Sequence, residues 1–224
     1  HAFGTLEELE ERAGTIALPA VVKPASGSMS VGVRLCRTRA ELLQAATAAS
    51  TSREWAADAW DLGRSIRRKG YRRESLHRRK FVVQSYLPSL DHDWKVLAYG
   101  RKYYALRRKI RAHDFRASGS GRFDFPSELP AGLLDYAARV HQRLNVPHLS
   151  VDIGAEESRF HLFEFQALHF GTLTIERSSF YFVASGGSWN RVDEASELEE
   201  EFARSVMEHL AVAEKTAGSG GPSS

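Results

Sequence analysis

The chain has 224 residues, of which 42% are hydrophobic and 26% are charged, as in soluble globular proteins. Its formal net charge is only +3, and its apolar runs all fall short of the roughly 20 residues that a membrane-spanning helix needs. The composition therefore excludes a helical membrane protein. The single cysteine, Cys36, cannot form an internal disulfide, so we expect a cytoplasmic protein in which Cys36 is a small buried hydrophobe.

The first part of the chain alternates between segments that are typical of helices and of strands. Thr38 and Glu41 have the spacing of a capping box, which predicts that a helix begins there. Residues 51–79 contain two tryptophans and many basic residues, and their pattern is ambiguous. In chain order we predict a helix at 5–13, strands at 18–24 and 31–36, a helix at 38–50 and a strand at 80–88.

Strands dominate the middle of the chain, and helices flank them. This arrangement favours an α+β fold over a doubly wound parallel sheet. In chain order we predict a hairpin of strands at 93–100 and 101–110, a Ser/Gly-rich loop at 112–126, a helix at 130–144, strands at 148–154 and 158–166, and a helix at 194–215.

Residues 64–80 concentrate positive charge, with nine Lys/Arg and one acidic residue, Glu74. A run of this kind is usually a solvated helix face or loop. The alternative is a docking surface for an anionic partner or substrate. Nucleic acid is disfavoured as the partner, because the run has only one aromatic residue and no nucleic-acid-binding motif accompanies it.

Two predicted strands late in the chain bring oxygen ligands together. Side chains alternate along a strand, so Asp152 points away from its apolar neighbours, and Glu164 and Gln166 share the face opposite Phe163 and Phe165. Two carboxylates and an amide oxygen suit Mg²⁺, which binds one or two protein carboxylates besides phosphate oxygens and water. A solvated sheet face has the same pattern, and the residues alone do not decide between the two.

The stretch VVKPASGSMSVGV, residues 21–33, joins two predicted strands through small residues. Ser26, Gly27 and Ser28 let backbone N–H groups approach phosphate oxygens, and Lys23 on the adjacent strand supplies a positive charge. It is no Walker A loop, because no Gly-Lys-Ser/Thr follows the glycines. An ordinary flexible hairpin is the alternative interpretation.

The segment QSYLP ends the strand predicted at 80–88. Its residues Gln84, Tyr86 and Leu87 are placed to offer backbone groups to an adenine edge, and Asp91 or Asp93 follows at a spacing suited to ribose hydroxyls.

The strand predicted at 101–110 is cationic. In a cleft, its charges would neutralise a transferring phosphoryl group, whereas on the surface they would only aid solubility. The basic residues in and just after this strand are Lys102, Arg107, Arg108, Lys109 and Arg111.

Taken in order, these motifs resemble those of the ATP-grasp superfamily, which includes D-alanine–D-alanine ligase and glutathione synthetase. KPASGSMSVGV is similar to the lysine and mobile loop of that family, QSYL to its adenine hinge, and DWKV, with Lys95, to its Asp-x-Arg/Lys strand. VDIG followed by FEFQ is similar to its magnesium-binding Asp and Glu-x-Asn. The resemblance spans residues 18 to about 170, and Gln166 stands where the family has asparagine.

The resemblance implies an α+β ATP-grasp fold in which two β-rich lobes clasp a nucleotide. It divides the chain into a remnant or linker helix (1–15), a small lobe with the phosphate loop (16–87), a large lobe with the metal site (88–213) and a flexible tail (214–224). The N-terminal α/β domain of the family is not recognisable, so we expect a missing domain or a partner chain.

The implied activity is ATP- and Mg²⁺-dependent: a small-molecule or peptide carboxylate is activated as an acyl phosphate and joined to an amine. Lys23 and the loop amides would hold the phosphates. Asp152 and Glu164 would bind Mg²⁺ together with Gln166. One alternative is a kinase of a polyanionic small molecule, which the basic run favours slightly. Another is a nucleotide-binding module without catalysis.

Three arginines are the catalytic candidates under this resemblance. Arg107 or Arg108 would stabilise the charge that spreads over the transferring phosphoryl group. Arg116, in the Ser/Gly-rich loop at 112–126, would clamp the substrate, although a plain surface loop is an equally good interpretation of that segment.

Overall fold

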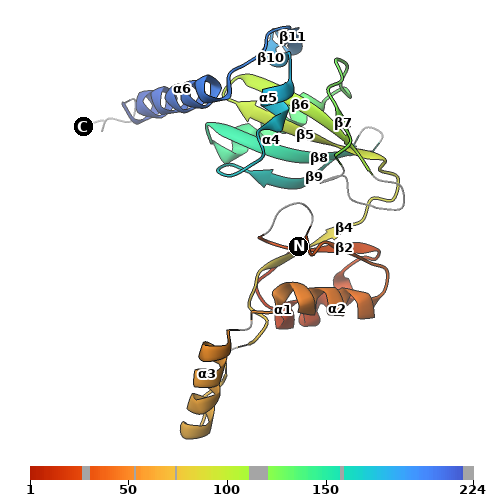
Figure 1. Cartoon of the computed structure of the whole chain (residues 1–224), viewed down its shortest axis with the longest axis vertical. Helices are drawn as coiled ribbons and strands as arrows, with labels where there is room; N and C mark the ends of the chain where they lie inside the picture. Colours follow the sequence, from red (N-terminus) through yellow and green to blue (C-terminus); the bar gives the residue numbers. More distant parts are fainter. Residues whose placement is uncertain (27–30, 53, 74, 111–120, 157–158, 219–224) are drawn as a thin grey trace, which may run out of the picture. The chain divides into compact units, whose positions relative to one another are not determined.

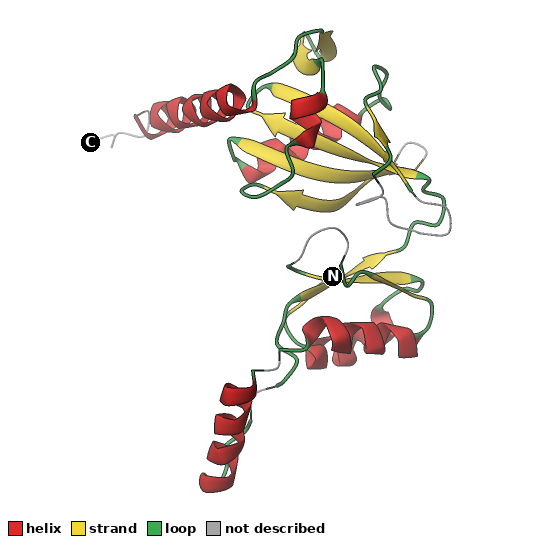
Figure 2. Cartoon of the chain, in the orientation of Figure 1, coloured by secondary structure: helices red, strands yellow, loops and turns green. Residues whose placement is uncertain are grey.

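The computed structural model describes residues 1–26, 31–52, 54–73, 75–110, 121–156 and 159–218. The chain divides into two compact units, residues 1–88 and 89–224 (Figure 1). Each unit has an antiparallel sheet of its own accompanied by helices, which confirms the α+β class (Figure 2). None of the described helices combines the length and the apolar content that a membrane crossing needs.

The first unit is built on a four-stranded sheet in the order β1-β4-β2-β3. Helices α1 and α2 lie on one face of this sheet and close its core (Figure 1). Its elements are β1 (Ala2–Phe3), α1 (Leu6–Arg12), a 3₁₀ turn (Ala13–Thr15), β2 (Ala20–Pro24), β3 (Arg34–Cys36), α2 (Arg39–Ser50), α3 (Trp55–Arg67) and β4 (Phe81–Ser85).

Alternation along β2 and β4 gives this sheet an inner and an outer face. Val22 and Phe81 are fully buried against the helices, whereas Lys23 points to the outer face. The predicted capping box is confirmed at the start of α2, where the Thr38 side chain accepts a hydrogen bond from the Glu41 amide at 3.2 Å. Cys36 is 1% exposed, as predicted for a small core residue.

Helix α3 resolves part of the ambiguous segment 51–79 and has no buried residue. Trp55 and Ile66 are 82% and 78% exposed. The polar side of the helix meets the chain that follows it, because the Tyr71 hydroxyl donates to the Asp61 carboxylate and Arg64 lies over the Tyr71 ring at 5.4 Å. The apolar stripe of α3, formed by Trp55, Leu62 and Ile66, is therefore exposed and packs on no core within the described residues.

The second unit is built on a larger antiparallel sheet in the order β11-β10-β6-β5-β8-β9, with β7 paired to β6. Gly100, with a φ of +60°, makes the tight turn of the predicted β5–β6 hairpin. The elements are β5 (His92–Tyr99), β6 (Lys102–Lys109), β7 (Phe123–Asp124), α4 (Leu133–Leu144), β8 (His148–Glu156), β9 (Arg159–Gln166), α5 (Leu173–Arg177), β10 (Tyr181–Ser185), β11 (Ser188–Val192) and α6 (Leu198–Gly218).

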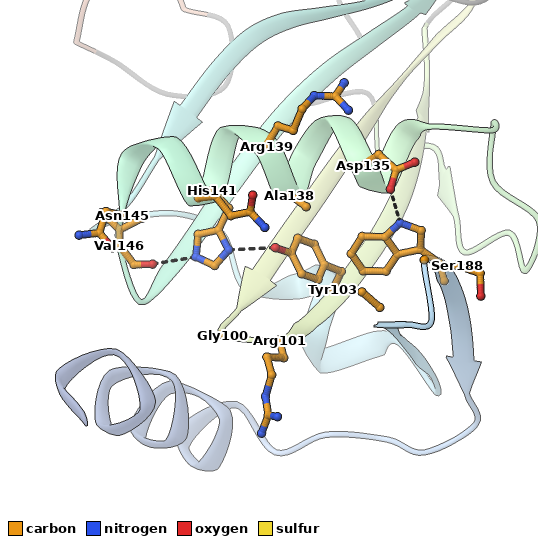
Figure 3. Close-up of a pocket in the computed structure, with 14 residues that line it drawn as sticks. Gly100, Arg101, Tyr103, Asp135, Ala138, Arg139, His141, Asn145, Val146 and Ser188 are labelled. Carbon is orange, nitrogen blue, oxygen red and sulfur yellow. Dashed lines mark hydrogen bonds between the residues drawn. The ribbon is translucent and has the colours of Figure 1, made fainter. Parts of the chain in front are cut away.

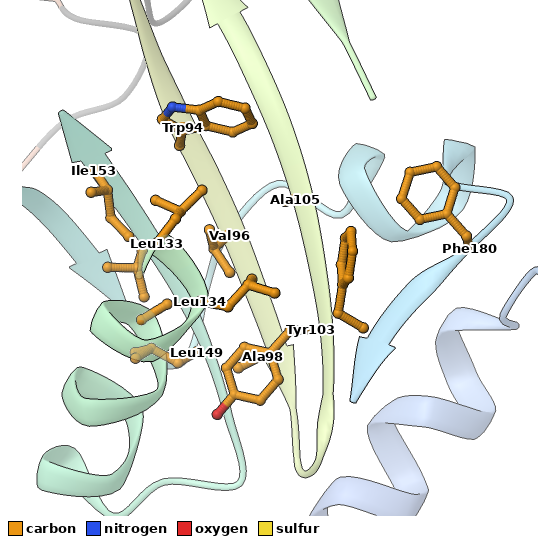
Figure 4. Packing of buried hydrophobic residues seen from close by; sticks show 13 residues of the cluster. Trp94, Val96, Ala98, Tyr103, Ala105, Leu133, Leu134, Leu149, Ile153 and Phe180 are labelled. Atoms are coloured by element: carbon orange, nitrogen blue, oxygen red, sulfur yellow. The ribbon is translucent and has the colours of Figure 1, made fainter. Parts of the chain in front are cut away.

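The two faces of the large sheet differ in what they carry. One face packs on α4 and forms the main core, in which Val96, Val151 and Leu133 are fully buried (Figure 4). On the opposite face, Leu97 and Tyr104 pack on Ile175 of α5. The remainder of that opposite face carries Lys95, Arg108, Ser150, Asp152, Glu164 and Gln166 besides Leu106, and we call it the polar face.

A β-bulge in β9 corrects one expectation. The sequence predicts that Phe163 and Phe165 share a face, but the register shifts so that Glu164 pairs with Asp152 and Leu162 with Ile153, and Phe163 is the extra residue. A Cβ atom at Gly154 would lie 2.4 Å from Phe163 Cζ, so the Phe163 ring lies directly over that glycine. Gly154 and Asp152 are two residues apart, and Phe163 therefore belongs to the polar face.

Candidate functional site

A row of directly paired residues crosses four strands of the polar face. Leu106 of β6 pairs with Lys95 of β5, Lys95 with Asp152 of β8, and Asp152 with Glu164 of β9. Residues paired in this way in antiparallel sheets have Cβ atoms about 4.5–5.5 Å apart. The predicted convergence of Asp152 and Glu164 is confirmed, and Gln166 lies on the same face two residues further along β9, opposite Ser150.

Arg108 is the centre of the ion pairs on this face. Its Nε and Nη2 atoms bond both oxygens of Asp93 at 2.7 Å, and Nη2 also lies 2.8 Å from Asp152 Oδ2. The side chains of Arg108 and Asp93 are only 12% and 9% exposed. One buried guanidinium thus holds two carboxylates from neighbouring strands.

Burial and charge act against each other in this cluster. Burial disfavours the charged form of Arg108, but Asp152 and Asp93 outweigh it and raise the pKa of the guanidinium. Burial also raises the pKa of the Asp93 carboxyl, against the opposing effect of Arg108. Arg108 consequently stays charged at any physiological pH.

Lys95 completes the cluster from the other side of Asp152. Its Nζ atom donates to Ser150 Oγ at 2.7 Å and to Asp152 Oδ1 at 3.5 Å. Both oxygens of Asp152 therefore face a cation, one from β5 and one from β6. Nothing in the sequence pattern singled out Ser150, whose partner could be found only from the strand register.

The oxygen ligands predicted for a magnesium ion differ in the partners that they already have. Glu164 is exposed, and neither its carboxylate nor the Gln166 amide has a side-chain hydrogen bond or ion pair among the residues that the structure describes. Within the same residues, no group of three or more His, Cys, Asp or Glu is arranged to hold a metal. A site with two carboxylates, one amide oxygen and phosphate oxygens suits Mg²⁺ rather than a transition metal.

The register separates the two arginines that the sequence could not rank. Arg107 points to the face opposite Asp152, where its Nε and Nη2 atoms bond the Asp124 carboxylate at 2.9 and 2.6 Å. Its guanidinium lies 5.9 Å from the Trp94 ring centre. Only Arg108 is brought next to Asp152.

In the first unit, Lys23 and Gln84 lie on the outer face of the small sheet. Lys23 pairs with Val82 and Gln84 with Val21, so Lys23 and Gln84 are diagonal neighbours on adjacent strands, a relation that corresponds to about 7–8 Å. Ser26 is exposed and lines a cavity of about 250 Å³ together with Arg79 and Lys80. Gly27 and Ser28 lie outside the described residues.

The other predicted residues are dispersed around these two faces. The Tyr86 amide donates to the Pro19 carbonyl at 3.2 Å, and Leu87 is half-buried. Asp91 has an exposed carboxylate next to the His92 ring, whereas the Asp93 carboxylate is taken by Arg108. Arg116 lies outside the described residues.

The sequence matches no family model, and it matches no curated protein. Solved structures do resemble the chain. The ADP complex of N5-carboxyaminoimidazole ribonucleotide synthetase matches with a TM-score of 0.50 and 14% identity, covering 80% of this chain and 42% of that one.

Two further similar structures are ligases of other substrates. Phosphoribosylamine–glycine ligase from Thermotoga maritima has a TM-score of 0.49 and 16% identity, with 75% of this chain and 42% of that chain covered. D-Alanine–D-alanine ligase from Bacillus anthracis, complexed with ATP, has a TM-score of 0.44 and 18% identity, with 75% and 49% covered. This chain spans less than half the length of each.

The antiparallel sheets and the match to the ribonucleotide synthetase agree with the motif order in the sequence. The chain covers only part of the proteins that it resembles, and over that part it has the fold of the ATP-grasp superfamily.

Proposed function

We propose that this chain is the catalytic part of an ATP- and Mg²⁺-dependent ligase that joins a carboxylate to an amine. The observation that carries the proposal is the row Lys95–Asp152–Glu164 with Arg108 beside it, on a fold shared with an enzyme solved with ADP bound. Two cations and two carboxylates on one sheet face suit a metal-bound polyphosphate.

In this proposal Asp152, Glu164 and Gln166 hold Mg²⁺, which screens the charge of the ATP phosphates. Glu164 is available, whereas Asp152 must exchange at least one of its contacts with Arg108 and Lys95. Each cation released from Asp152 in this way then faces the phosphate oxygens. Lys23 is proposed as a further phosphate contact, and the segment from Gln84 to Leu87 as the contact for adenine.

The reaction proceeds in two displacements. A carboxylate oxygen of the substrate attacks the γ-phosphorus, the bond to the β–γ bridging oxygen breaks, and ADP leaves. The amine nitrogen then attacks the carbonyl carbon of the acyl phosphate, phosphate departs, and the nitrogen loses a proton. Arg108 and Lys95 stabilise the charge that develops on the phosphoryl oxygens, and the protein contributes mainly positioning and electrostatics.

The test measures ADP release and acyl phosphate together. The chain is incubated with ATP, MgCl₂ and a panel of amino acids and peptides, with hydroxylamine added to trap an acyl phosphate as a hydroxamate. We expect a hydroxamate for at least one carboxylate, and its loss in Asp152→Asn. Asp193→Asn is the matched control, because Asp193 is an exposed aspartate that pairs with Arg191 away from the polar face.

The alternatives give different results in the same assay. ADP release that yields a stable phosphorylated product, with neither hydroxamate nor dependence on an amine, would show the kinase, whose anionic substrate would suit the exposed arginines of residues 64–73. ATP binding without turnover would show a non-catalytic module. If ATP does not bind, all three functions are wrong.

A further inference from the structure

A cavity of about 570 Å³ lies on the α4 side of the large sheet (Figure 3). Its walls come from the β5–β6 turn, α4 and the β10–β11 hairpin. Side chains alternate along β6, so Tyr103 points into the α4 side while Tyr104 and Arg108 point to the other. The cavity is thus separated by the thickness of the sheet from the polar face, and its size suits a small molecule.

A short hydrogen-bond chain fixes the polarity of the cavity wall. His141 Nε2 lies 2.7 Å from the Val146 carbonyl oxygen, which can only accept, so Nε2 carries the proton. Burial lowers the pKa of His141, and Nδ1 of the neutral ring is then an acceptor. The Tyr103 hydroxyl, 3.0 Å away, donates to that Nδ1. The phenol proton is engaged in this hydrogen bond, so the phenol oxygen can only accept a further one.

A second acceptor, Asp135, lies further along the same wall on α4. Asp135 Oδ1 accepts a hydrogen bond from Trp189 Nε1 at 2.8 Å, which fixes the carboxylate and leaves lone pairs on both oxygens. The Trp189 and Tyr103 rings meet edge to face with centroids 4.9 Å apart. Acceptor oxygens and aromatic surface are thus brought together in one wall.

The two arginines at the margin of the cavity do not neutralise this wall. Arg101 Nη2 lies 3.3 Å from Glu208 Oε1, and the Arg139 guanidinium lies 5.8 Å from the Tyr136 ring centre. Figure 3 shows both guanidinium groups directed away from Tyr103. Among the described residues that line the cavity, Asp135 supplies the only carboxylate, and Gln142, Asn145 and Ser188 are neutral polar side chains.

We propose that this cavity binds an organic ammonium compound, either a simple primary amine or the ammonium end of an amino acid. An ammonium group has three donors, which suit the two oxygens of the Asp135 carboxylate, and the Tyr103 oxygen offers a further acceptor in the same cavity. The aromatic rings attract a cation through their faces and cover the apolar body of the ligand. A carboxylate or a neutral alcohol of the same shape lacks the charge that this wall recognises.

Calorimetry with matched probes tests the proposal on the full chain. The probes are phenethylamine, 2-phenylethanol and phenylacetate, which share a ring and differ in the terminal group. We expect phenethylamine to bind at least tenfold more tightly than the other two. L-Phenylalanine separates the two sources of ammonium: binding tighter than that of phenethylamine indicates an amino acid, and weaker binding indicates a simple amine.

Two variants connect binding to the named oxygens. Asp135→Asn keeps the hydrogen bond from Trp189 and removes the charge, and we expect at least tenfold weaker binding of phenethylamine. Tyr103→Phe is expected to weaken it severalfold, and Asp193→Asn, on the segment after the same hairpin, is expected to leave it unchanged. Equal binding of phenylacetate, or phenethylamine binding that survives both Asp135→Asn and Tyr103→Phe, would overturn the proposal.

The proposed ammonium site does not depend on ATP chemistry. Calorimetry with ATP therefore tests the ligase proposal separately from the ammonium site. ATP binding is measured on the Asp135→Asn chain, in which we expect it to be unchanged. If the chain binds phenethylamine but does not bind ATP, the ammonium site is supported and the ligase function is wrong.

Discussion

Arg108 joins two carboxylates from different strands: it forms a paired contact with Asp93 of β5 and reaches Asp152 of β8 at 2.8 Å. A buried ion pair of this kind adds little net stability, but removal of one partner leaves the other charge uncompensated. Arg108 therefore links the stability of the second unit to the geometry of the proposed metal ligand.

Arg108→Ala is expected to lower the free energy of unfolding by about 3–5 kcal/mol at pH 7, because two buried carboxylates lose their shared cation. The deficit should shrink as the pH falls, since the Asp93 carboxyl, whose pKa burial raises, can then be protonated in the folded state. Urea unfolding at pH 7 and pH 5 measures both effects. Arg12→Ala, which breaks an exposed pair with Glu8, should change stability by less than about 0.5 kcal/mol, and an equal cost of the two variants would contradict the argument.

Gly154 is required by the bulge in β9. Gly154→Ala should cost about 1–3 kcal/mol, because the new Cβ would lie 2.4 Å from Phe163 Cζ and 3.0 Å from Leu90 Cδ1. Thermal unfolding of Gly154→Ala, Phe163→Leu and the double variant forms a mutant cycle, in which Phe163→Leu should restore part of the loss. Gly171→Ala is the control, since nothing lies within 4 Å of its added Cβ.

Lys23 and Ser28 are expected to differ in their effect on ATP. Lys23→Ala should weaken ATP binding roughly 10- to 100-fold, since hydrogen bonds to charged groups contribute about 1.5–3 kcal/mol. Ser28→Ala should weaken it less than about threefold, because the backbone of that loop is proposed to hold the phosphates. Calorimetry with Mg·ATP measures both, and Lys69→Ala serves as the control lysine. A larger effect of Ser28→Ala than of Lys23→Ala would contradict the assignment.

Alternating patterns predicted the direction of side chains where polar and apolar residues alternate along a strand. The facing of Asp152 and Glu164 followed from β8 and β9, which carry polar residues on one side and apolar residues on the other. The choice between Arg107 and Arg108 could not be predicted in this way, because apolar residues are buried on both faces of β6. Tyr103 and Tyr104, on opposite faces, are 5% and 1% exposed. Without a polar side, the pattern gives no information on the direction of either arginine.

Other features had weak or absent local signals. The extra residue of the bulge at Phe163 has no sequence signature of its own, since the shift depends on how the ring packs over Gly154. Helix α5 has only five residues, too few for helical periodicity to be visible. The β10–β11 hairpin, in contrast, turns on Gly186-Gly187, a recognisable two-residue turn signal that the sequence analysis did not use.

The exposed stripe of α3 predicts unusual tolerance to substitution. Trp55→Ala should change the free energy of unfolding by less than about 0.5 kcal/mol, because the side chain is 82% exposed. Leu42→Ala in α2 should cost about 2–5 kcal/mol, since that side chain is fully buried. Urea titrations compare the two. A Trp55→Ala loss close to that of Leu42→Ala would mean that α3 packs on something in solution.

His141 and His148 make stability depend on pH in a defined direction. Burial lowers the pKa of both histidines below the ordinary value near 6.5, so the folded state binds fewer protons than the unfolded state. Their contribution is complete above pH 6.5 and is lost as the pH falls towards the folded pKa. The urea midpoint should therefore decrease from pH 7.5 to pH 5.5.

Asp93 acts in the opposite direction, because its raised pKa lets the folded state gain a proton in acid. The informative comparison is consequently between variants and not between pH values of the wild type alone. His141→Gln should reduce the difference in midpoint between pH 7.5 and pH 5.5, since one proton uptake on unfolding is removed. His169→Gln changes an exposed histidine and should leave the difference as it is. An unchanged difference in His141→Gln would mean that the Tyr103–His141 pair does not persist in solution.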